Sequence, residues 1–576
     1  MPSGPTASAS AETAFPCKQG GRLFRSSCFL RKNRIFAKKD GYLKRKPMKH
    51  FSVLLFLGLS LLAGCRQAAP ATEGCWFPGS LNPLTYTDIP DNDVIRVGDD
   101  YYMVSTTMFF CPGAPIMHSK DLVHWRIVSY IYDVLEDDAV YRLENGKNAY
   151  GKGQWATSLR YHDGMYYALF VANDQRRSYL YKTADIVNGP WERHVFDDWF
   201  FHDPGLLFDD GRLWVVWGNG ELRLTELEPD GSGVIGGKDV IVSAPKKGWG
   251  LRAEGAHFYH IGDYYYVLEI DWPLDDIRQA TVWRSRKIEG PYESKVVLRG
   301  TLDGRSKDGI AQGPLVDTPE GDWYAIQFQD HGAVGRIPTL QPVRWTDGWP
   351  MMGDNGTPLQ DFRPSLAPDP DGDYVWDSDE FDSPQLALVW QWNHMPPEDW
   401  AVVDGALRLR AHPAHGIHDA RGTLTQRTVG PRCESMVKLD VSELKAGDEA
   451  GLCAFQSHGA RIGVRVQADG SRRVVLTRTE PGRKGKRKEK TVFSAPLSGT
   501  DVWLRIRYVF TPVEDGEEAD TAFLSYSEDG VNWIEAEEAL RMRYTLDYFI
   551  GYRSGLYCFG QGGGTAAFDW FRQRVI

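Results

Sequence analysis

Short runs of alternating apolar and polar residues fill the chain between residues 75 and 360, and turn residues separate these runs in pairs. Five pairs are clearest, at 94–105, 158–170, 206–218, 257–270 and 315–328. Each has an apolar strand, a Gly/Asp turn and a second strand rich in aromatic residues, which is the pattern of a β-hairpin. The turn aspartates are 47 to 64 residues apart, enough chain for a four-stranded sheet per unit; they are Asp99, Asp163, Asp210, Asp263 and Asp322. Five such units predict a five-bladed β-propeller, in which radial repetition protects the sheet edges.

The second half of the chain, residues 376–576, shows the same alternation, with turn signals at Asp404-Gly405, Asp469-Gly470 and Asp529-Gly530. The stretch Pro364–Asp373 between the halves has the composition of a linker. Aromatic residues make up 12% of the chain and there are 59 glycines, which together favour strands and tight turns over helices. We therefore predict an all-β protein with a propeller at 75–360 and a second β-domain at 376–576.

Residues 1–64 are predicted to be a leader followed by a signal peptide. Met48 opens a second N-terminus, in which Lys49 precedes the apolar stretch Phe51–Leu62, of signal-peptide rather than membrane-spanning length. The sequence Leu-Ala-Gly-Cys that ends at Cys65 resembles a bacterial lipobox. On this interpretation Cys65 is lipidated, and the protein is an exported bacterial lipoprotein anchored to a membrane at the periplasmic face or the cell surface. A plain signal peptide cleaved elsewhere and a short internal core segment are the alternatives.

The charge distribution excludes one class of partner. The net charge is −11, and residues 1–47 hold 11 Lys and Arg against Glu12 and Asp40, so the rest of the chain is strongly acidic. An acidic body makes nucleic acid an unsuitable partner, because phosphate binding needs clustered Lys and Arg. The one dense basic run, Arg483–Lys490, lies between strand-like segments, and we interpret it as a solvated hairpin loop.

The cysteines indicate neither a metal site nor a disulfide framework. There are eight, and those after Cys65 are widely spaced without a CxxC pair. Buried free thiols are the favoured interpretation, with one bridge such as Cys433–Cys453 as the alternative.

Three acidic residues occupy matching positions upstream of the turns. Asp91, Asp203 and Glu254 precede the turn aspartates of the first, third and fourth units by 8, 7 and 9 residues, and Ser158 and Gln312 hold similar places in the other two units. In a propeller these positions fall near the innermost strand of each blade, beside the central channel, so the three carboxylates would converge. Unpaired carboxylates are costly to bury, so convergence indicates chemistry, although each acid alone could simply cap a turn.

Hydrolysis of a glycosidic bond uses such a set. One protonated carboxyl group donates to the leaving oxygen, an ionised one activates water on the opposite face, and a third can keep the acid protonated by like-charge repulsion. Trp155, in the run GQWATSL, could stack on a sugar ring, with blade packing as the alternative.

Three segments resemble glycoside hydrolase family 43: NPLTYTDIPDNDVIRVGDDYYMVSTT (82–107), HDPGLLFDDG (202–211) and AEGAHFY (253–259). The resemblance implies that Asp91 is the general base, Glu254 the general acid and Asp203 the residue that modulates the acid. The run GRIPTLQPVRW (335–345) resembles the last-blade segment whose arginine contacts substrate, which implies Arg336. Residues 376–576 resemble the concanavalin-like β-sandwich that follows the propeller in β-xylosidase-type members.

The sequence departs from the family pattern at several places. Ser158 stands where many members have Asp, but that Asp is not one of the three catalytic acids. Met108, Phe109 and Phe110 differ from the Phe-Glu-Trp run of xylosidase members, so Met108 is a candidate substrate contact and the choice of pentose stays open.

A calcium ion is neither required nor excluded by the sequence, and no cofactor is expected to be required. Some members hold calcium or its water with a channel histidine; the matching place here is Ala311-Gln312, so Gln312 is a candidate substrate contact and a central calcium is in doubt. Asp382 and Asp569 in the sandwich could bind a structural calcium, with ordinary turn carboxylates as the alternative.

We predict an inverting exo-glycosidase that removes terminal pentose, β-D-xylose or α-L-arabinofuranose, from oligosaccharides of plant polysaccharides. The carboxyl groups of Asp91 and Glu254 should then lie about 6.5–9.5 Å apart. Two alternatives remain: a non-catalytic cell-surface glycan-binding lipoprotein, and a hydrolase of galactan or arabinan backbones. The sandwich is predicted to pack on the propeller and help wall the site, with glycan binding as its alternative role.

Overall fold

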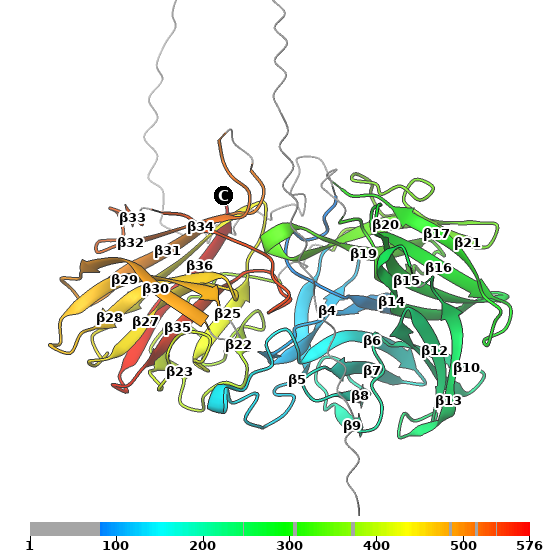
Figure 1. Ribbon diagram of the computed structural model, residues 1–576, viewed down its shortest axis with the longest axis horizontal. Helices are drawn as coiled ribbons and strands as arrows, with labels where there is room; N and C mark the ends of the chain where they lie inside the picture. Colours follow the sequence, from blue (N-terminus) through cyan, green and yellow to red (C-terminus); the bar gives the residue numbers. More distant parts are fainter. Residues whose placement is uncertain are drawn as a thin grey trace, which may run out of the picture. The chain divides into compact units, whose positions relative to one another are not determined.

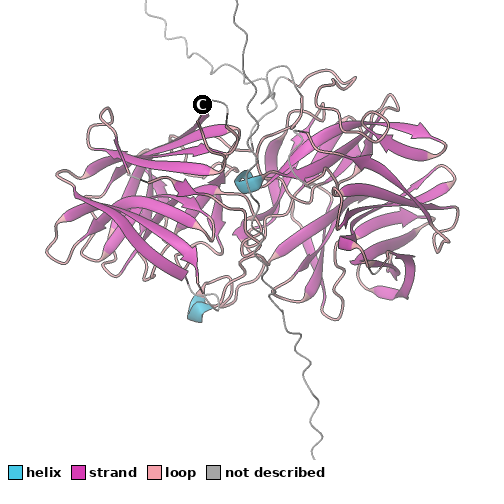
Figure 2. Cartoon of the chain, turned by 45° about the horizontal axis from the view of Figure 1, so that its top comes forward, coloured by secondary structure: helices cyan, strands magenta, loops and turns pink. Residues whose placement is uncertain are grey.

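Figure 1 shows a computed structural model, which describes residues 81–245, 247–302, 308–369, 375–482, 487–512, 516–536 and 538–576. Regular structure in these residues is β-strand apart from two single 3-10 turns, η1 (Glu144–Gly146) and η2 (Gly332–Val334), coloured cyan in Figure 2. No helix in these ranges has the length and apolar character to cross a bilayer. The predicted leader, signal peptide and lipidated Cys65 lie outside the described residues.

The first part of the chain forms five antiparallel sheets of four strands each, so the predicted five-bladed propeller is confirmed. Blade one consists of β1 (Asp93–Val97), β2 (Asp100–Val104), β4 (Gly113–Ser119) and β5 (Arg126–Tyr132). Blade two consists of β6 (Gln154–His162), β7 (Met165–Ala172), β8 (Arg177–Thr183) and β9 (Glu192–Phe196). Blade three consists of β10 (Gly205–Asp209), β11 (Arg212–Asn219), β12 (Glu221–Leu227) and β13 (Val234–Ser243). Blade four consists of β14 (Trp249–Ile261), β15 (Tyr264–Pro273), β16 (Gln279–Ser285) and β17 (Glu293–Arg299). Blade five consists of β18 (Leu315–Asp317), β19 (Trp323–Asp330), β20 (Arg336–Thr346) and β21 (Trp349–Met352).

The five turns used to predict the blades join the first and second strand of each blade. The first hairpin shows why the pattern is so regular: Val97 pairs with Asp100 across the two-residue turn, and buried side chains of β2 alternate with more exposed ones. Because side chains of a strand point alternately to its two faces, aromatic and aliphatic residues at every second position pack between neighbouring blades.

The chain before β1 closes the ring onto the last blade. The Asn82 side chain donates to the Leu340 carbonyl at 2.8 Å and accepts from the Leu340 N–H at 2.8 Å, and the Ile89 N–H donates to the Arg336 carbonyl at 2.9 Å. These bonds join the segment before β1 to β20, so the first and last blades are tied together.

The second part of the chain is a sandwich of two antiparallel sheets, as the resemblance implied. One sheet has the order β3 (Phe110–Cys111), β22 (Gln391–Asn393), β25 (Thr423–Arg427), β35 (Arg553–Gly560), β27 (Asp448–Phe455), β28 (Gly459–Val466), β29 (Arg472–Pro481), β30 (Arg487–Pro496). The other has the order β23 (Ala401–Val403), β24 (Ala406–Arg410), β36 (Thr565–Val575), β26 (Arg432–Asp440), β31 (Asp501–Val509), β32 (Thr521–Ser527), β33 (Ile534–Glu535), with β34 (Leu540–Arg541) paired to β32. Buried aliphatic residues of both sheets, such as Leu452, Ile462 and Leu504, form one core between them.

One strand of the sandwich comes from the propeller part of the chain. The loop between β2 and β4 carries β3, and there Phe110 pairs with Asn393 and Cys111 with Trp392 of β22. Phe109 and Phe110 are fully buried, and the Phe109 ring stacks on His394 with centroids 4.9 Å apart. Phe109 and Phe110, which depart from the family pattern together with Met108, therefore lie in the contact between propeller and sandwich.

The loop prediction for Arg483–Lys490 is wrong for its second half. Residues 487–490 begin β30, where Lys488 pairs with Glu480 and Arg487 with Pro481 of β29; residues 483–486 lie outside the described ranges. β30 ends the sheet, and a run of charged residues on such an edge discourages pairing with another chain.

The interpretation of the cysteines as buried free thiols is confirmed for the four that the structure describes, Cys111, Cys433, Cys453 and Cys558. Burial raises the pKa of the Cys433 thiol to about 12. These residues are small core side chains, without the thiolate character that metal binding requires.

Candidate active site

Unusual backbone conformations place the candidate residues at the ends of the innermost strands. Asp91 and Asp203 each lie two residues before the first strand of their blade and have left-handed φ values of 50° and 48°. Gln312, three residues before β18, has a φ of 61°. Non-glycine residues in this region are uncommon and cluster at functional sites, where the strain fixes the direction of a side chain. Glu254 instead lies within β14, at an irregularity of its pairing with β15.

Asp91 is held by two side chains from blade five. The Arg336 guanidinium donates from Nη1 to Asp91 Oδ1 at 2.5 Å, and Gln312 Nε2 donates to the same oxygen at 3.3 Å. The Asp91 side chain is 8% exposed. Burial raises the pKa of Asp91, while the positive charge of Arg336 opposes that rise. The sequence-predicted base and the sequence-predicted arginine are therefore direct partners.

Asp203 and Glu254 lie together on the other side of a histidine. His202 Nε2 is 3.7 Å from Asp203 Oδ2 and 3.6 Å from Glu254 Oε2. Asp203 Oδ2 also accepts from the Gly255 N–H at 3.0 Å. Burial raises the pKa of Asp203, and the charge of Glu254 adds to this, whereas His202 lowers it. The structure thus brings these two acids together, as the repeat positions indicated.

His202 was missed by the sequence reasoning, although it stands beside Asp203 in the quoted run HDPG. The negative charge of Asp203 is the main reason that the pKa of His202 is raised to about 9, with Glu254 contributing and burial opposing. A protonated His202 places a positive charge between the two acids. Asn219, which donates from Nδ2 to Glu254 Oε2, was missed as well, because a single Asn at a strand end carries no sequence signal.

The sandwich contributes a wall of the site through the loop between β34 and β35. The Phe549 ring lies 4.4 Å from the Arg336 guanidinium carbon and 6.0 Å, edge to face, from the Trp155 ring. Phe549 has a φ of 58°, and Tyr544 lies near it at 6.4 Å between rings. The prediction that the sandwich packs on the propeller beside the site agrees with these contacts.

Two polar atoms around this wall are buried and have no hydrogen-bond partner among the described residues: Trp155 Nε1 and Tyr544 Oη. Buried polar groups are normally paired with protein, water or a ligand. The Trp155 ring lies 5.9 Å from the His202 ring and the Tyr544 ring 6.4 Å from the Phe549 ring, so an indole donor and a hydroxyl near the site suit the hydroxyl groups of a sugar.

Of the remaining predicted contacts, Gln312 lies at the site and Met108 lies beneath it. Gln312 contacts Asp91 and fills the space in front of the Gly255 backbone, where an added Cβ would be 2.6 Å from the Gln312 amide carbon. Met108 exchanges two backbone hydrogen bonds with Gln154, and its side chain is 1% exposed. The Met108 side chain packs in the core around β3, and its predicted contact with a sugar stays a prediction.

A calcium ion in the channel stays a prediction, and the carboxylate of Asp93 has two neighbours there: Arg160, and His257, whose Nε2 lies 3.6 Å from Asp93 Oδ1. Arg160 of blade two bridges its two neighbouring blades: its Nη1 donates to Asp93 Oδ2 of blade one at 2.7 Å and its Nε to the Leu206 carbonyl of blade three at 2.8 Å. A guanidinium therefore already neutralises the channel carboxylate. Within the described residues, one set of three potential ligand side chains has all its ligand atoms within 4.8 Å of one another, and its members are His202, Asp203 and Glu254. A metal ion there would occupy the acids themselves.

The two sandwich aspartates show the features of ordinary surface carboxylates. Asp569 forms an ion pair with Lys438, and Asp382 is exposed. A structural calcium at these positions stays a prediction.

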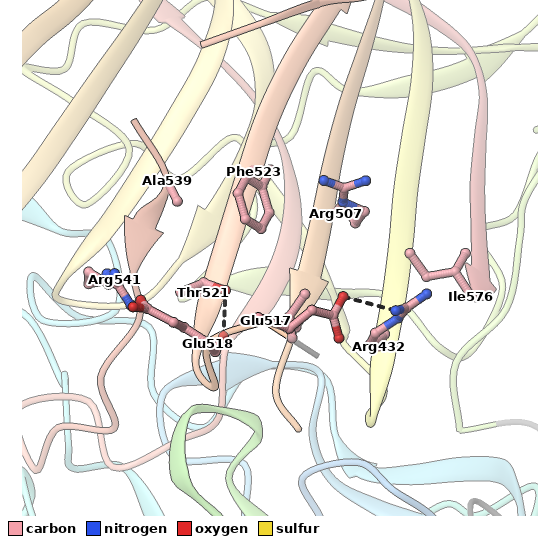
Figure 3. Close-up of a pocket in the computed structure, with 11 residues that line it drawn as sticks. Arg432, Arg507, Glu517, Glu518, Thr521, Phe523, Ala539, Arg541 and Ile576 are labelled. Carbon is pink, nitrogen blue, oxygen red and sulfur yellow. Dashed lines mark hydrogen bonds and ion pairs between the residues drawn. The ribbon is translucent and has the colours of Figure 1, made fainter. Parts of the chain in front are cut away.

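A separate cavity of about 600 Å³ lies on the sandwich and contains none of the three acids. Figure 3 shows Phe523 and Arg507 at its floor and the hydrogen bond of Arg432 to Glu517, which is 2.9 Å long. The cavity is lined by sandwich residues alone, so it forms no part of the arrangement around Asp91 and Glu254.

A five-bladed propeller with two aspartates and a glutamate at the inner ends of its blades is the architecture of a glycoside hydrolase. The chain belongs to glycosyl hydrolases family 43: the family model matches residues 80–350. A second model, the β-xylosidase C-terminal concanavalin A-like domain, matches residues 378–574.

Relatives resemble the whole of the described chain. A β-xylosidase of Formosa agariphila is 28% identical, over 90% of this chain and 96% of its own length. A non-reducing end α-L-arabinofuranosidase of Bacteroides ovatus is 27% identical, over 86% of this chain and 94% of its own. Among solved structures, a bifunctional GH43-CE protein of Bacteroides eggerthii is 39% identical with a TM-score of 0.79; the match covers 86% of this chain and 63% of that one, less than two thirds of its length.

Proposed function

We propose that this protein is an inverting exo-glycosidase that releases a terminal pentose, β-D-xylose or α-L-arabinofuranose, from hemicellulose-derived oligosaccharides. The proposal rests on one observation, that the three acids have different partners. Asp91 is bound to Arg336, whereas Glu254 and Asp203 flank His202. The relatives named above, one β-xylosidase and one arabinofuranosidase, support the two pentoses.

Asp91 is the proposed general base. Its carboxylate must be ionised to take a proton from water, and the Arg336 guanidinium at 2.5 Å favours the ionised form. Gln312 holds the same oxygen, Oδ1, and the proposal assigns the attacking water to Oδ2.

Glu254 is the proposed general acid. It donates its proton to the glycosidic oxygen as the bond breaks, and Asp203 lies beside it, on the same histidine. Asn219 fixes Oε2, which orients the carboxyl group.

The wall of Phe549, Trp155 and Arg336 supports exo rather than endo action. These side chains, from sandwich and propeller, contact one another, and we place the terminal residue against them, which would leave a longer chain no path beyond it. The unpaired Trp155 Nε1 and Tyr544 Oη would bind hydroxyl groups of that residue.

Turnover of nitrophenyl glycosides tests the proposal. Wild type, Asp91→Asn and Glu254→Ala are compared on nitrophenyl β-D-xyloside, nitrophenyl α-L-arabinofuranoside and xylobiose. Nitrophenolate leaves without a proton, so Glu254→Ala should keep far more activity on it than on xylobiose, whereas Asp91→Asn should lose activity on all substrates. Asp163→Asn, at a turn aspartate whose side chain is 90% exposed, is the matched control and should equal wild type.

The stereochemistry is read by proton NMR of the first sugar released. Inversion of a β-xyloside gives α-xylose first; β-xylose first would refute the single-displacement mechanism. Absence of turnover by wild type on all three substrates would favour a glycan-binding protein or a backbone hydrolase.

We further propose that Cys65 is lipidated and anchors the exported protein to a membrane. Lys49, the apolar stretch Phe51–Leu62 and Cys65 follow one another in the order expected of a lipoprotein signal peptide, which supports this proposal. After expression in a bacterial host, detergent phase partition should retain wild type in the detergent and release Cys65→Ser to the aqueous phase; equal partition would refute lipidation.

A further inference from the structure

Two arginines face each other in the interior of the sandwich sheet. Arg427 ends β25 and Arg553 begins β35, and the two are direct partners in the antiparallel register. Their side chains are 1% and 2% exposed. Directly opposed residues have Cβ atoms about 4.5–5.5 Å apart on one face of the sheet, and like charges placed there repel.

Several donors of this pair have no acceptor. Arg427 donates from Nε to the Asp88 carbonyl at 3.0 Å, and Arg553 donates from Nη1 to Gln391 Oε1 at 2.9 Å. Arg427 Nη1, Arg427 Nη2 and Arg553 Nε are buried and have no hydrogen-bond partner in the described part of the chain. A guanidinium keeps its proton in proteins, so neither residue can become neutral to relieve the repulsion.

The surrounding groups do not balance the two charges. Among the described residues, Asp88 is the carboxylate that acts on both arginines, and its oxygens already accept from the N–H groups of Arg336 and Gly551, each at 2.8 Å. Tyr130 lies beside Arg427 but is neutral, because burial raises its pKa to about 12, and its hydroxyl donates to the Leu388 carbonyl at 2.6 Å. The Phe110 ring lies 3.9 Å from the Arg553 guanidinium carbon and carries no net charge. Two cations and one carboxylate leave an uncompensated positive charge in the protein interior, which is strongly unfavourable.

The donors without acceptors and the excess positive charge indicate a bound anion that carries one negative charge and donates no hydrogen bond. We propose that a chloride ion binds between Arg427 and Arg553. It would accept from the unpaired Nη and Nε atoms of both residues and balance the excess charge. A water molecule could accept the same hydrogen bonds but would leave the charge unbalanced.

The proposal is tested with crystals of the protein grown in sodium bromide and measured at the bromine absorption edge. An anomalous peak is expected in contact with Arg427 Nη1 or Nη2 and Arg553 Nε. Arg461 is an internal control in the same sheet: it is equally buried, but its Nε, Nη1 and Nη2 all donate to carboxylates of Glu449 and Glu489, at 2.7–2.8 Å. No peak is expected at Arg461.

Thermal unfolding provides the second measurement. The protein is compared in sodium chloride and in sodium gluconate at equal ionic strength, since gluconate is too large for an enclosed site between two side chains. The unfolding midpoint should rise steadily with the logarithm of chloride concentration and stay flat in gluconate, because a ligand that binds only the folded state stabilises it. In Arg553→Met, where Arg427 and Asp88 remain as a neutral pair, the dependence on chloride should disappear.

Either of two results overturns the proposal: no bromide peak between the two guanidinium groups, or equal unfolding midpoints of wild type in chloride and gluconate. If Arg553→Met does not fold, the bromide peak and the comparison of chloride with gluconate on the wild-type protein still decide whether the anion binds.

Discussion

Replacing Arg336 with methionine removes the positive charge of the side chain and keeps much of its volume. The guanidinium lies 2.5 Å from Asp91 Oδ1 and 3.0 Å from Asp330 Oδ1, with the Phe549 ring on its face. Asp330 keeps a second partner, Arg278 at 2.6 Å, whereas Asp91 keeps only the neutral amide of Gln312 among the contacts described above. The substitution therefore acts chiefly on the charge of the proposed base.

The expected loss follows from the geometry. With charge centres roughly 4 Å apart and an effective dielectric constant of about 20, the attraction is about 4 kcal/mol. A factor of ten in rate corresponds to about 1.4 kcal/mol, so the upper limit of the effect is about 10³-fold. We expect kcat/KM of Arg336→Met to fall by about 10²–10³-fold at acid pH, because protonated Asp91 cannot accept a proton from water. Removing one partner of a buried pair should also destabilise the fold by about 3–5 kcal/mol.

The assay is the pH profile of kcat/KM on a nitrophenyl pentoside, measured at a temperature where urea titration shows the variant to be folded. Burial already raises the pKa of Asp91, so activity falls when the pH drops below that value; without Arg336 this acid limb should move to higher pH, and activity should recover as the pH rises. Arg336→Lys, which keeps one charge but loses the planar fork, should lie between wild type and Arg336→Met. A loss that is equal at every pH, with the acid limb unmoved, would refute the idea that Arg336 acts through the charge of Asp91.

Three further predictions concern neighbouring residues. His202→Asn should remove a pH-dependent contribution to the free energy of unfolding. Because the pKa of His202 is raised from 6.5 to about 9, this contribution is complete below pH 6.5 and is lost as the pH rises through 9. Urea titrations of wild type and variant should therefore converge above pH 9. Phe549→Ala should raise KM for xylobiose by about tenfold with little change in kcat, since the ring over Arg336 contributes about 1–2 kcal/mol; an unchanged KM would show that the ring is not a wall of the site. Asp88→Asn should lower the free energy of unfolding by about 3–5 kcal/mol, because it removes the carboxylate beside two buried arginines, and a stability equal to wild type in urea would contradict the charge assignment.

The propeller could be predicted from the sequence because its signal is local. Each turn, such as Asp210-Gly211, lies within a dozen residues of both strands that it joins, and the strands bury alternate side chains. Asp91, Asp203 and Glu254 could be found for the same reason: they stand at similar offsets from a local turn, so they fall at related places in the blades, just before β1 and β10 and inside β14.

Contacts between distant parts of the chain could not be predicted in this way. Phe549 reaches Arg336 and Trp155 from a loop of the sandwich, and nothing in the alternation around it indicates which surface that loop meets. The strand Phe110–Cys111 has two residues, too few for a periodic pattern, and its partner β22 is nearly three hundred residues further along the chain. His202 could not be predicted for a different reason. Its neighbours Asp203 and Glu254 were identified from the sequence, but the positive charge that His202 gains from them depends on the distances between the three side chains.

The sandwich belongs to the proposed site, and the segment Asp88–Asp93 explains why. At one end, Asp88 binds the N–H groups of Arg336 in the propeller and Gly551 in the sandwich, so it fixes the loop of Phe549 against the last blade. At the other end, Asp93 pairs with Arg160 of blade two. Asp91 lies between these two anchors in a strained left-handed conformation, which can persist because both flanks are held. A propeller without its sandwich would lose Gly551 and Phe549 together, and with them one anchor of the base and one wall of the pocket.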